Sequence, residues 1–306
     1  MKVADFEIYK SMLYERSGLV ITPDKSYLLD SRLTPIAKKW GHPTLEAMTL
    51  QLRALPDEAL IKDIVEAMTT NETSFFRDTR PFEIFKDTVL PHMTEARKGK
   101  KTLRIWCAAC SSGQEPYSLA MILKEKELLL KGWRFEIVAT DLSEEILATA
   151  KKGSYSQFEV QRGLPIQYLM KYFTQVGETW QIKDEIKNMI KFSSFNLLGD
   201  MSRMGMFDVV FCRNVLIYFD EKTKGSVLEK MERQMESDGF LFLGGAETVL
   251  GITNKFVAQP EKRGLYVKNT GQAAARPSSI SSSSSGSATT TASSTSSFTS
   301  GLFKRT

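Results

Sequence analysis

Apolar residues recur at helical spacing in short segments through residues 4–69. Glycine or proline interrupts these segments at Gly18, Pro23, Gly41, Pro43 and Pro56. Because such residues end helices and begin turns, this region predicts a small helical bundle. A further helix is expected at residues 81–96, where Pro81 suits the first turn and Pro91 predicts an interruption.

From Thr102 onward, short apolar runs alternate with amphipathic segments. The run that starts at Arg104 ends in the small residues Ala108–Gly113, and an amphipathic segment follows at Tyr117–Leu130. A second apolar run, Phe135–Asp141, comes next. Alternating strands and helices are typical of a mainly parallel sheet with helices on both faces, and we expect this arrangement here.

Residues 153–188 interrupt this alternation. The interval contains turn residues at Gly163–Pro165 and at Gly177, and it contains a β-type stretch at Glu178–Ile182. Short strands that are separated by such turns pair in antiparallel fashion. The interval therefore predicts a small antiparallel insertion in the α/β region.

The chain changes in composition after residue 268, where Ser, Thr, Ala and Gly dominate without periodicity. Such a segment buries too little apolar surface to offset the entropy of ordering, so residues 269–306 predict a disordered Ser/Thr-rich tail. Its end, Phe298–Arg305, fits either a short docking motif or an end without function. The predicted domains are a helical domain at residues 1–80, an α/β domain at 81–268 and this tail.

No apolar run approaches the roughly 18 to 20 residues that span a bilayer, and the N-terminus lacks a signal-peptide core. We therefore expect a cytoplasmic protein without membrane insertion. Three cysteines, Cys107, Cys110 and Cys212, lie in or beside apolar strands, which suits free thiols in a reducing compartment. Because no second Cys or His pair accompanies Cys107 and Cys110, no metal site is expected.

The formal net charge of +5 arises partly in the tail, where Arg276, Lys304 and Arg305 have no acidic neighbours. The rest of the chain is only slightly basic, so nucleic-acid binding is not expected. A local basic cluster comprises Lys25, Arg32, Lys38, Lys39 and Arg53. This cluster is either a solvated helix face or an electrostatic dock for an acidic partner.

The loop at Ala108–Gly113 follows a predicted strand, and wound α/β sheets bind ligands at that end of their strands. Its small residues would let a ligand approach the backbone. Glu115 argues against a phosphate loop, because such loops are rich in glycine and place no carboxylate beside the ligand. A nicotinamide-dependent dehydrogenase is disfavoured for the same reason, whereas a cationic ligand group suits this carboxylate.

Asp141 ends the next predicted strand. An acid at this position can accept hydrogen bonds from the two hydroxyls of a ribose, or it can cap the helix that begins near Ser143. Together with Glu115, it indicates a nucleoside site that lacks a pyrophosphate loop and has a carboxylate for a positive charge. S-adenosylmethionine has the amino group, sulfonium and ribose that such a site would bind.

Four segments of the chain resemble, in the same order, the motifs of the chemotaxis receptor glutamate methyltransferases, the CheR family. They are Asn71–Asp78, Trp106–Ser118, Phe192–Leu198 and Phe207–Phe219. The resemblance covers most of residues 1–268. It implies an α/β fold, with a Rossmann-like S-adenosylmethionine-dependent methyltransferase sheet, a small all-helical N-terminal domain and an inserted antiparallel β subdomain at about residues 153–188.

The same resemblance implies a protein-glutamate O-methyltransferase. Such an enzyme uses S-adenosyl-L-methionine to form glutamyl 5-O-methyl esters on the cytoplasmic region of chemoreceptors during sensory adaptation, and it releases S-adenosyl-L-homocysteine. A glutamate with a pKa near 4.3 is more than about 99% ionised at pH 7, so direct in-line transfer needs no general base. The alternatives are a non-catalytic cofactor- or receptor-binding scaffold and a methyltransferase for a different acceptor.

The resemblance assigns roles by position. Asn71, Thr73 and Arg77 would contact the cofactor from the N-terminal side, Glu115 its amino group, Asp141 its ribose, Asn196 and Leu197 its adenine, and Arg213 and Asn214 its methionyl end. The catalytic residues would be Arg77, which orients the acceptor carboxylate, and Tyr218, which lies near the transferred methyl. The alternatives are an ion pair of Arg77 with Asp78 or Glu72, and a core position for Tyr218.

The implied partners are the acidic methylation helices of chemoreceptors, which would dock on a basic N-terminal helix through Arg32, Lys38 and Lys39. A monomer is expected. In some family members the inserted subdomain captures a receptor pentapeptide by strand addition, and those members have a longer, glycine-containing loop. Because the corresponding segment Tyr172–Trp180 is short, a pentapeptide-independent enzyme is expected.

Overall fold

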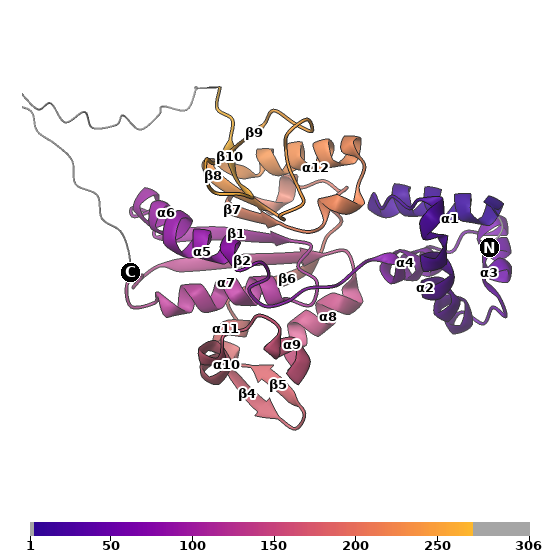
Figure 1. The fold of residues 1–306 in the computed structure, drawn as a ribbon, viewed down its shortest axis with the longest axis horizontal. Helices are drawn as coiled ribbons and strands as arrows, with labels where there is room; N and C mark the ends of the chain where they lie inside the picture. The colour runs from indigo at the N-terminus through magenta and orange to yellow at the C-terminus, as the bar shows by residue number, and fades with distance from the viewer. Residues whose placement is uncertain (1–2, 272–306) are drawn as a thin grey trace, which may run out of the picture. The chain divides into compact units, whose positions relative to one another are not determined.

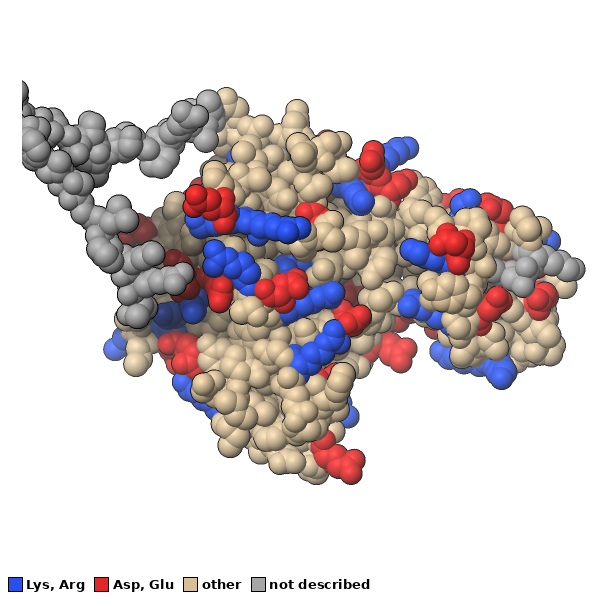
Figure 2. All heavy atoms as spheres, viewed as in Figure 1, with Lys and Arg blue, Asp and Glu red and all other residues tan. Residues whose placement is uncertain are grey.

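The structure, a computed structural model, describes residues 3–271 of the 306-residue chain (Figure 1). The predicted tail and its terminal segment lie almost wholly outside the described residues. Within residues 3–271, no helix is long and apolar enough to cross a membrane. On the face shown in Figure 2, Lys and Arg side chains are interspersed with Asp and Glu side chains.

The N-terminal helices pack around an apolar core of their own (Figure 1). They are α1 (Val3–Ser17), α2 (Ser26–Lys39), α3 (Leu45–Ala54) and α4 (Glu58–Met68), with the short 3₁₀ helix η1 (Pro23–Lys25) before α2. Thr44 and Asp57 begin α3 and α4, because their side-chain oxygens accept backbone N–H groups of the first turn. Tyr9, Leu33 and Ile64 help to fill the core. The predicted helical bundle is confirmed.

Residues 80–96 form one helical stretch with a wide turn in its middle. The helix α5 (Arg80–Ile84) leads into the π-helical turn η2 (Phe85–Val89), which continues into α6 (Leu90–Ala96). The α-helix is thus interrupted just before Pro91, as expected, but by a π-helical turn and not by a gap in the helix. The Leu90 N–H instead bonds the Phe85 carbonyl, and this widened turn accommodates the ring of Pro91 and its missing N–H.

The centre of the fold is a seven-stranded sheet of order β6-β2-β1-β7-β8-β10-β9. The first five strands in this order are parallel, and β10 is antiparallel to both of its neighbours. The predicted, mainly parallel sheet is confirmed. The strands are β1 (Thr102–Ala108), β2 (Arg134–Asp141), β6 (Ile190–Ser194), β7 (Phe207–Cys212), β8 (Met235–Leu243), β9 (Phe256–Ala258) and β10 (Leu265–Lys268).

Side chains of β1 alternate between two cores on opposite faces of the sheet. Ile105 and Cys107 pack in the core that includes α5 and α6, whereas Trp106 and Ala108 pack in the other core. The helices α7 and α8 contribute to the first core and α12 to the second. Their bounds are α7 (Gln114–Glu125), α8 (Glu144–Lys152) and α12 (Glu221–Arg233), and two 3₁₀ helices, η3 (Ser202–Met204) and η4 (Leu216–Tyr218), flank β7.

A second, three-stranded sheet of order β3-β5-β4 lies in the interval that the sequence marks as an insertion. All of its pairings are antiparallel, so the predicted antiparallel insertion is confirmed. Phe75 anchors it to the main domain, because its ring packs on Tyr155 and Phe173 at centroid distances of 5.0 and 5.6 Å. Its elements are β3 (Ser154–Ser156), α9 (Gln157–Gln161), α10 (Ile166–Tyr172), β4 (Phe173–Val176), β5 (Thr179–Ile182) and α11 (Asp184–Lys187).

Candidate functional site

A pocket opens at the carboxyl ends of β1, β2, β6 and β7, which is the edge where parallel sheets bind ligands. The loops that follow these strands line it, together with the segments that follow α1 and α4. The structure brings together at this pocket all ten of the site residues predicted from the sequence, namely Asn71, Thr73, Arg77, Glu115, Asp141, Asn196, Leu197, Arg213, Asn214 and Tyr218.

The loop after β1 forms the floor of the pocket with Ala109, Cys110 and Ser111. Ala109 and Ser111 have left-handed backbones, with φ values of 59° and 51°. The Ser111 N–H donates to Asp141 Oδ2 at 2.8 Å, so the strained loop is tied to the end of β2. The small side chains leave the backbone open to a ligand, as the sequence predicts. The following helix, α7, starts and ends earlier than the predicted Tyr117–Leu130.

Asp141 is a buried carboxylate whose oxygens meet backbone donors. In addition to the bond from Ser111, Oδ1 accepts the Ser143 N–H at 3.1 Å. Burial raises the pKa of Asp141, and these N–H groups oppose that shift. The alternative that Asp141 caps the next helix is wrong, because Ser143 is the N-cap and its hydroxyl accepts the Ile146 N–H. Asp141 therefore faces the pocket with acceptor capacity left for a ligand.

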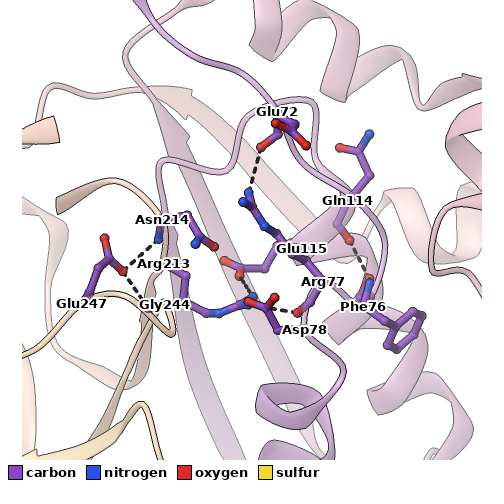
Figure 3. A network of polar contacts seen from close by, with 11 residues as sticks. Glu72, Phe76, Arg77, Asp78, Gln114, Glu115, Arg213, Asn214, Gly244 and Glu247 are labelled. Atoms are coloured by element: carbon purple, nitrogen blue, oxygen red, sulfur yellow. Dashed lines mark hydrogen bonds and ion pairs between the residues drawn. The ribbon is translucent and has the colours of Figure 1, made fainter. Parts of the chain in front are cut away.

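Glu115 forms an ion pair with Arg213 in the interior of the site (Figure 3). Arg213 Nη1 lies 2.7 Å from Glu115 Oε2, and Arg213 Nη2 lies 2.7 Å from Asp78 Oδ2. The Arg213 side chain is only 2% exposed, and Nη2 also donates to the Arg77 carbonyl at 2.9 Å. Burial raises the pKa of Glu115, and the guanidinium of Arg213 opposes this shift. Arg213, which follows β7, thereby joins this part of the chain to α7 and to the segment after α4.

Arg77 points from the segment after α4 toward Glu72, whose backbone carbonyl accepts from Nη1 at 2.9 Å (Figure 3). The predicted alternative, an ion pair with Asp78 or Glu72, is wrong, because these carboxylates pair with Arg213 and Arg162. Within residues 3–271, no carboxylate lies at ion-pair distance from the Arg77 guanidinium. This guanidinium at the pocket wall therefore has donors for an anionic group.

The backbone around Arg77 is strained. Phe76, Asp78 and Thr79 have φ values of 49°, 66° and 49°, which is a left-handed conformation that costs energy for residues other than glycine. Two contacts hold it. The Phe76 N–H donates to the Ser118 hydroxyl at 3.0 Å, and this hydroxyl donates to the Gln114 carbonyl at 2.7 Å on α7. The helix that carries Glu115 thus also fixes the segment that carries Arg77.

Residues after β6 connect the pocket to the helical bundle. The Asn196 side-chain amide donates to the Arg16 carbonyl at 2.7 Å and accepts the Leu198 N–H at 2.9 Å. Leu197 is buried and, with Phe195, supplies an apolar wall. Tyr218 is half-buried at the pocket wall and belongs to no core cluster of the described residues, so its predicted core alternative is wrong.

Sequence reasoning missed two contributions to this site. Ser17, at the end of α1, and Leu19, just after it, also line the pocket, although no chemical feature of the sequence marks them. Glu247 lies behind the loop that follows β7, where its carboxylate accepts backbone N–H groups (Figure 3). A signal for it exists, since the glycines Gly244 and Gly245 precede this acid at the end of an apolar strand.

Two residues of the basic cluster, Arg32 and Lys39, make contacts within the protein. Arg32 donates to the carbonyls of Met68 and Thr69, both at 2.9 Å, and so satisfies the end of α4. Lys39 pairs with Asp63 at 2.8 Å. Arg32 thus differs from the freely exposed docking residue that the sequence predicts, whereas the side chain of Lys39 is still 64% exposed.

The residues of the pocket fit S-adenosylmethionine. Two carboxylates, the partly buried Glu115 and the buried Asp141, suit an ammonium group and ribose hydroxyls, and Leu19, Phe195 and Leu197 suit the flat face of a base. The thiols of Cys107, Cys110 and Cys212 are buried and unpaired. In the part of the chain that the structure describes, no group of three or more His, Cys, Asp and Glu side chains is placed to hold a metal ion.

Comparisons with known proteins match both the helical and the α/β part of the chain. The family model described as CheR methyltransferase, all-alpha domain, matches residues 4–69, and CheR methyltransferase, SAM binding domain, matches residues 71–265. The chain is 40% identical over 256 residues to chemotaxis protein methyltransferase Cher2 of Pseudomonas putida, covering 82% of this chain and 93% of that protein. Chemotaxis protein methyltransferase 1 of Pseudomonas aeruginosa is 40% identical over 257 residues, covering 83% of this chain and 93% of that protein.

Proposed function

This chain belongs to the CheR methyltransferase family, and we propose that its pocket serves the methylation of glutamate side chains on the cytoplasmic region of chemoreceptors. The chain is an S-adenosylmethionine-dependent methyltransferase that is related to chemotaxis protein methyltransferases. The products would be glutamyl 5-O-methyl esters and S-adenosylhomocysteine. One observation carries the proposal, namely that the residues predicted for the cofactor and for the acceptor all line one pocket.

Different residues of the pocket would contact different parts of the cofactor. Glu115 would accept from the amino group, and Asp141 from the ribose hydroxyls. Leu197 would contact the adenine beside Asn196, whose own amide also holds the end of α1. Arg213 and Asn214 would close the methionyl end, and Asn71 and Thr73 the opposite wall. When bound, S-adenosylmethionine supplies a methyl group on a positively charged sulfur that leaves readily.

Arg77 and Tyr218 would act on the acceptor. The Arg77 guanidinium donates to one backbone carbonyl and keeps donors for a carboxylate, so it can fix the orientation of an acceptor glutamate. Tyr218 would border the line of transfer. Since the acceptor is already ionised at neutral pH, the residues need only align it, and alignment can lower a barrier by roughly 7 to 11 kcal/mol.

The receptor would dock beside α2. Lys38 is exposed and Lys39 is largely exposed, so both can meet acidic methylation helices, whereas Arg32 would act indirectly by holding α4. The exchange Lys38→Glu should raise KM for the receptor and leave kcat unchanged. An unchanged KM would remove α2 from the docking surface.

The enzyme would not need a receptor pentapeptide. The strands β4 and β5 are joined by the turn Gly177–Glu178, which gives the insertion a tight hairpin and no extended loop. Calorimetric titration of the full chain with a receptor-tail pentapeptide should show no binding. Micromolar binding would contradict this part of the proposal.

The decisive experiment uses methyl-labelled cofactor and receptor cytoplasmic fragments. We expect label on the receptor that mild alkali releases as methanol, because carboxyl methyl esters hydrolyse in base. Label that resists alkali would indicate a different acceptor. Cofactor binding without any transfer of label would indicate a scaffold.

The role of Arg77 can be tested in the same assay. Arg77→Ala should bind S-adenosylhomocysteine but transfer methyl groups about 100-fold more slowly, because the acceptor loses its alignment. Arg80→Ala is a matched control, since Arg80 is a nearby exposed arginine that pairs with Glu83 outside the pocket. Normal turnover by Arg77→Ala would remove this residue from catalysis.

A further inference from the structure

The carboxylate of Glu247 is surrounded by backbone donors from two loops. Oε2 accepts the Gly244 N–H at 2.6 Å and the Asn214 N–H at 2.9 Å (Figure 3). Oε1 accepts the N–H groups of the next three residues of the loop after β7, Val215 at 2.9 Å, Leu216 at 2.7 Å and Ile217 at 3.3 Å. Successive N–H groups that converge in this way form an anion-binding nest, which here is filled by a side chain.

The held loop is the one that carries the acceptor side of the site. Arg213 comes directly before the bonded residues, Asn214 is the first of them, and Tyr218 comes directly after the last. Asn214 has a left-handed backbone, with a φ of 60°, so the turn needs an external hold. Glu247 itself does not line the pocket. Its hydrogen bonds therefore act on the reaction through this loop, and its charge also helps to raise the pKa of Glu115.

Gly244 provides separate evidence for this hold. A Cβ atom on Gly244 would lie 2.7 Å from Glu247 Oε2 and 2.9 Å from Asn214 N. Real Cβ atoms do not approach neighbours so closely, so only glycine lets the loop after β8 come this near to the loop after β7. Gly244 and the carboxylate of Glu247 thus form the same contact between the loop after β8 and the loop after β7.

We infer that Glu247 is a positioning residue for methyl transfer, which sets the loop that presents Arg213, Asn214 and Tyr218; this inference rests on the proposed function. Glutamine at this position would keep one acceptor oxygen, and the backbone N–H groups that the other oxygen accepts would face an amide NH2 instead. The loop would relax, and Arg213 would lose its fixed approach to Glu115. The ribose acceptor Asp141 lies on β2 and is held by other donors, so the nucleoside end of the site should be unaffected.

This separation gives a test that a general loss of stability would not imitate. We would measure the binding of S-adenosylhomocysteine and of methylthioadenosine, which lacks the amino-acid end, to the full chain and to Glu247→Gln. We expect about 10-fold weaker binding of S-adenosylhomocysteine and about 100-fold slower methylation, with methylthioadenosine binding unchanged. Equal weakening of both ligands, or of neither, would overturn the inference.

Asp57→Asn is the matched control. Asp57 also accepts two backbone N–H groups through its carboxylate, but it lies at the start of α4 and touches no pocket residue through these bonds. It should lower stability without separating the two ligands. If Glu247→Gln does not fold, Gly244→Ala disturbs the same contact from the other loop and should separate the ligands in the same way; an equal effect on both would again overturn the inference. Because the comparison of the two ligand affinities does not depend on methylation, a wild-type chain that binds cofactor but methylates no receptor would refute the proposed function alone.

Discussion

The charge state of Glu115 governs how the pocket would receive a cationic ligand. Burial holds the pKa of this carboxyl above its ordinary range, and Arg213 only opposes that shift. A raised pKa in the folded protein means that Glu115 contributes stability to the free protein at low pH, and this contribution is lost as the pH rises through the raised pKa. Ligand binding has the opposite sign, because an ammonium group binds the ionised form.

We therefore predict that affinity for S-adenosylhomocysteine is full above the raised pKa of Glu115 and falls as the pH is lowered through it. The loss approaches 10-fold for each pH unit below that value, since each proton must leave before the ligand binds. Calorimetry from about pH 8 to about pH 5 would measure it. Methylthioadenosine is the control, because it has no ammonium group and can report only the titration of Asp141, whose pKa is also raised. The same slope for both ligands would contradict the assignment.

At this scale the sequence predicts positions better than contacts. Asp141 lies at the end of a strand and Glu115 at the start of the helix after a loop, and both positions follow from local rules. The partners of Arg213 are not local: Glu115 lies 98 residues away in sequence and Asp78 lies 135 residues away. The same limit explains why Arg32, which the sequence presents as an exposed base, instead bonds carbonyls 36 and 37 residues away.

Among the elements, the insertion touches the segment that carries Arg77 through Gly163. This residue has a φ of +90°, and a Cβ atom there would lie 2.2 Å from the Phe75 carbonyl oxygen. Gly177, in the turn between β4 and β5, has a φ of +61° but nothing within 4 Å of such an atom. Both glycines have a left-handed backbone, but only Gly163 has a neighbouring atom too close for a Cβ atom.

Alanine at each position should therefore have different costs. Gly177→Ala should cost about 1 kcal/mol from backbone strain alone. Gly163→Ala should cost about 1 to 3 kcal/mol more, because Phe75 must move, and it should also slow methyl transfer through displacement of Arg77. Urea unfolding and the labelled-methyl assay would measure both effects. Equal losses at the two positions would show that the insertion and this segment are not coupled.

The elements themselves follow from spacing, and the exceptions have local causes. The parallel sheet and the insertion were predicted because each has its own period of apolar and turn residues. The kind of interruption before Pro91 was not, since the π-helical turn depends on the Leu90 N–H reaching the Phe85 carbonyl. A proline in the sequence shows that a regular α-helical turn is disfavoured there. The proline alone does not show which irregular turn takes its place.

For the described chain as a whole, the helical bundle completes the pocket. Ser17 and Leu19 line it beside residues of the sheet, and several bonds join the two regions, among them one from the Ser143 hydroxyl to Glu66 Oε2 at 2.9 Å. The Tyr14 hydroxyl donates to Asp220 at 2.9 Å, the Asn196 amide to the Arg16 carbonyl at 2.7 Å, and the Val20 N–H to the Tyr218 carbonyl at 2.9 Å. A ligand that contacts both regions stabilises their association as well as each region.

We therefore predict that S-adenosylhomocysteine protects backbone amides of both regions from hydrogen exchange. Protection should rise at residues 13–20 and 69–78 as well as in the loops after β1, β6 and β7, because opening of either side exposes the ligand. The helix α3 is the internal control, since none of its residues lines the pocket. Protection confined to the sheet loops would mean that the bundle only borders the site. A receptor docked on the basic residues of α2 would then reach a pocket to which α1 contributes nothing.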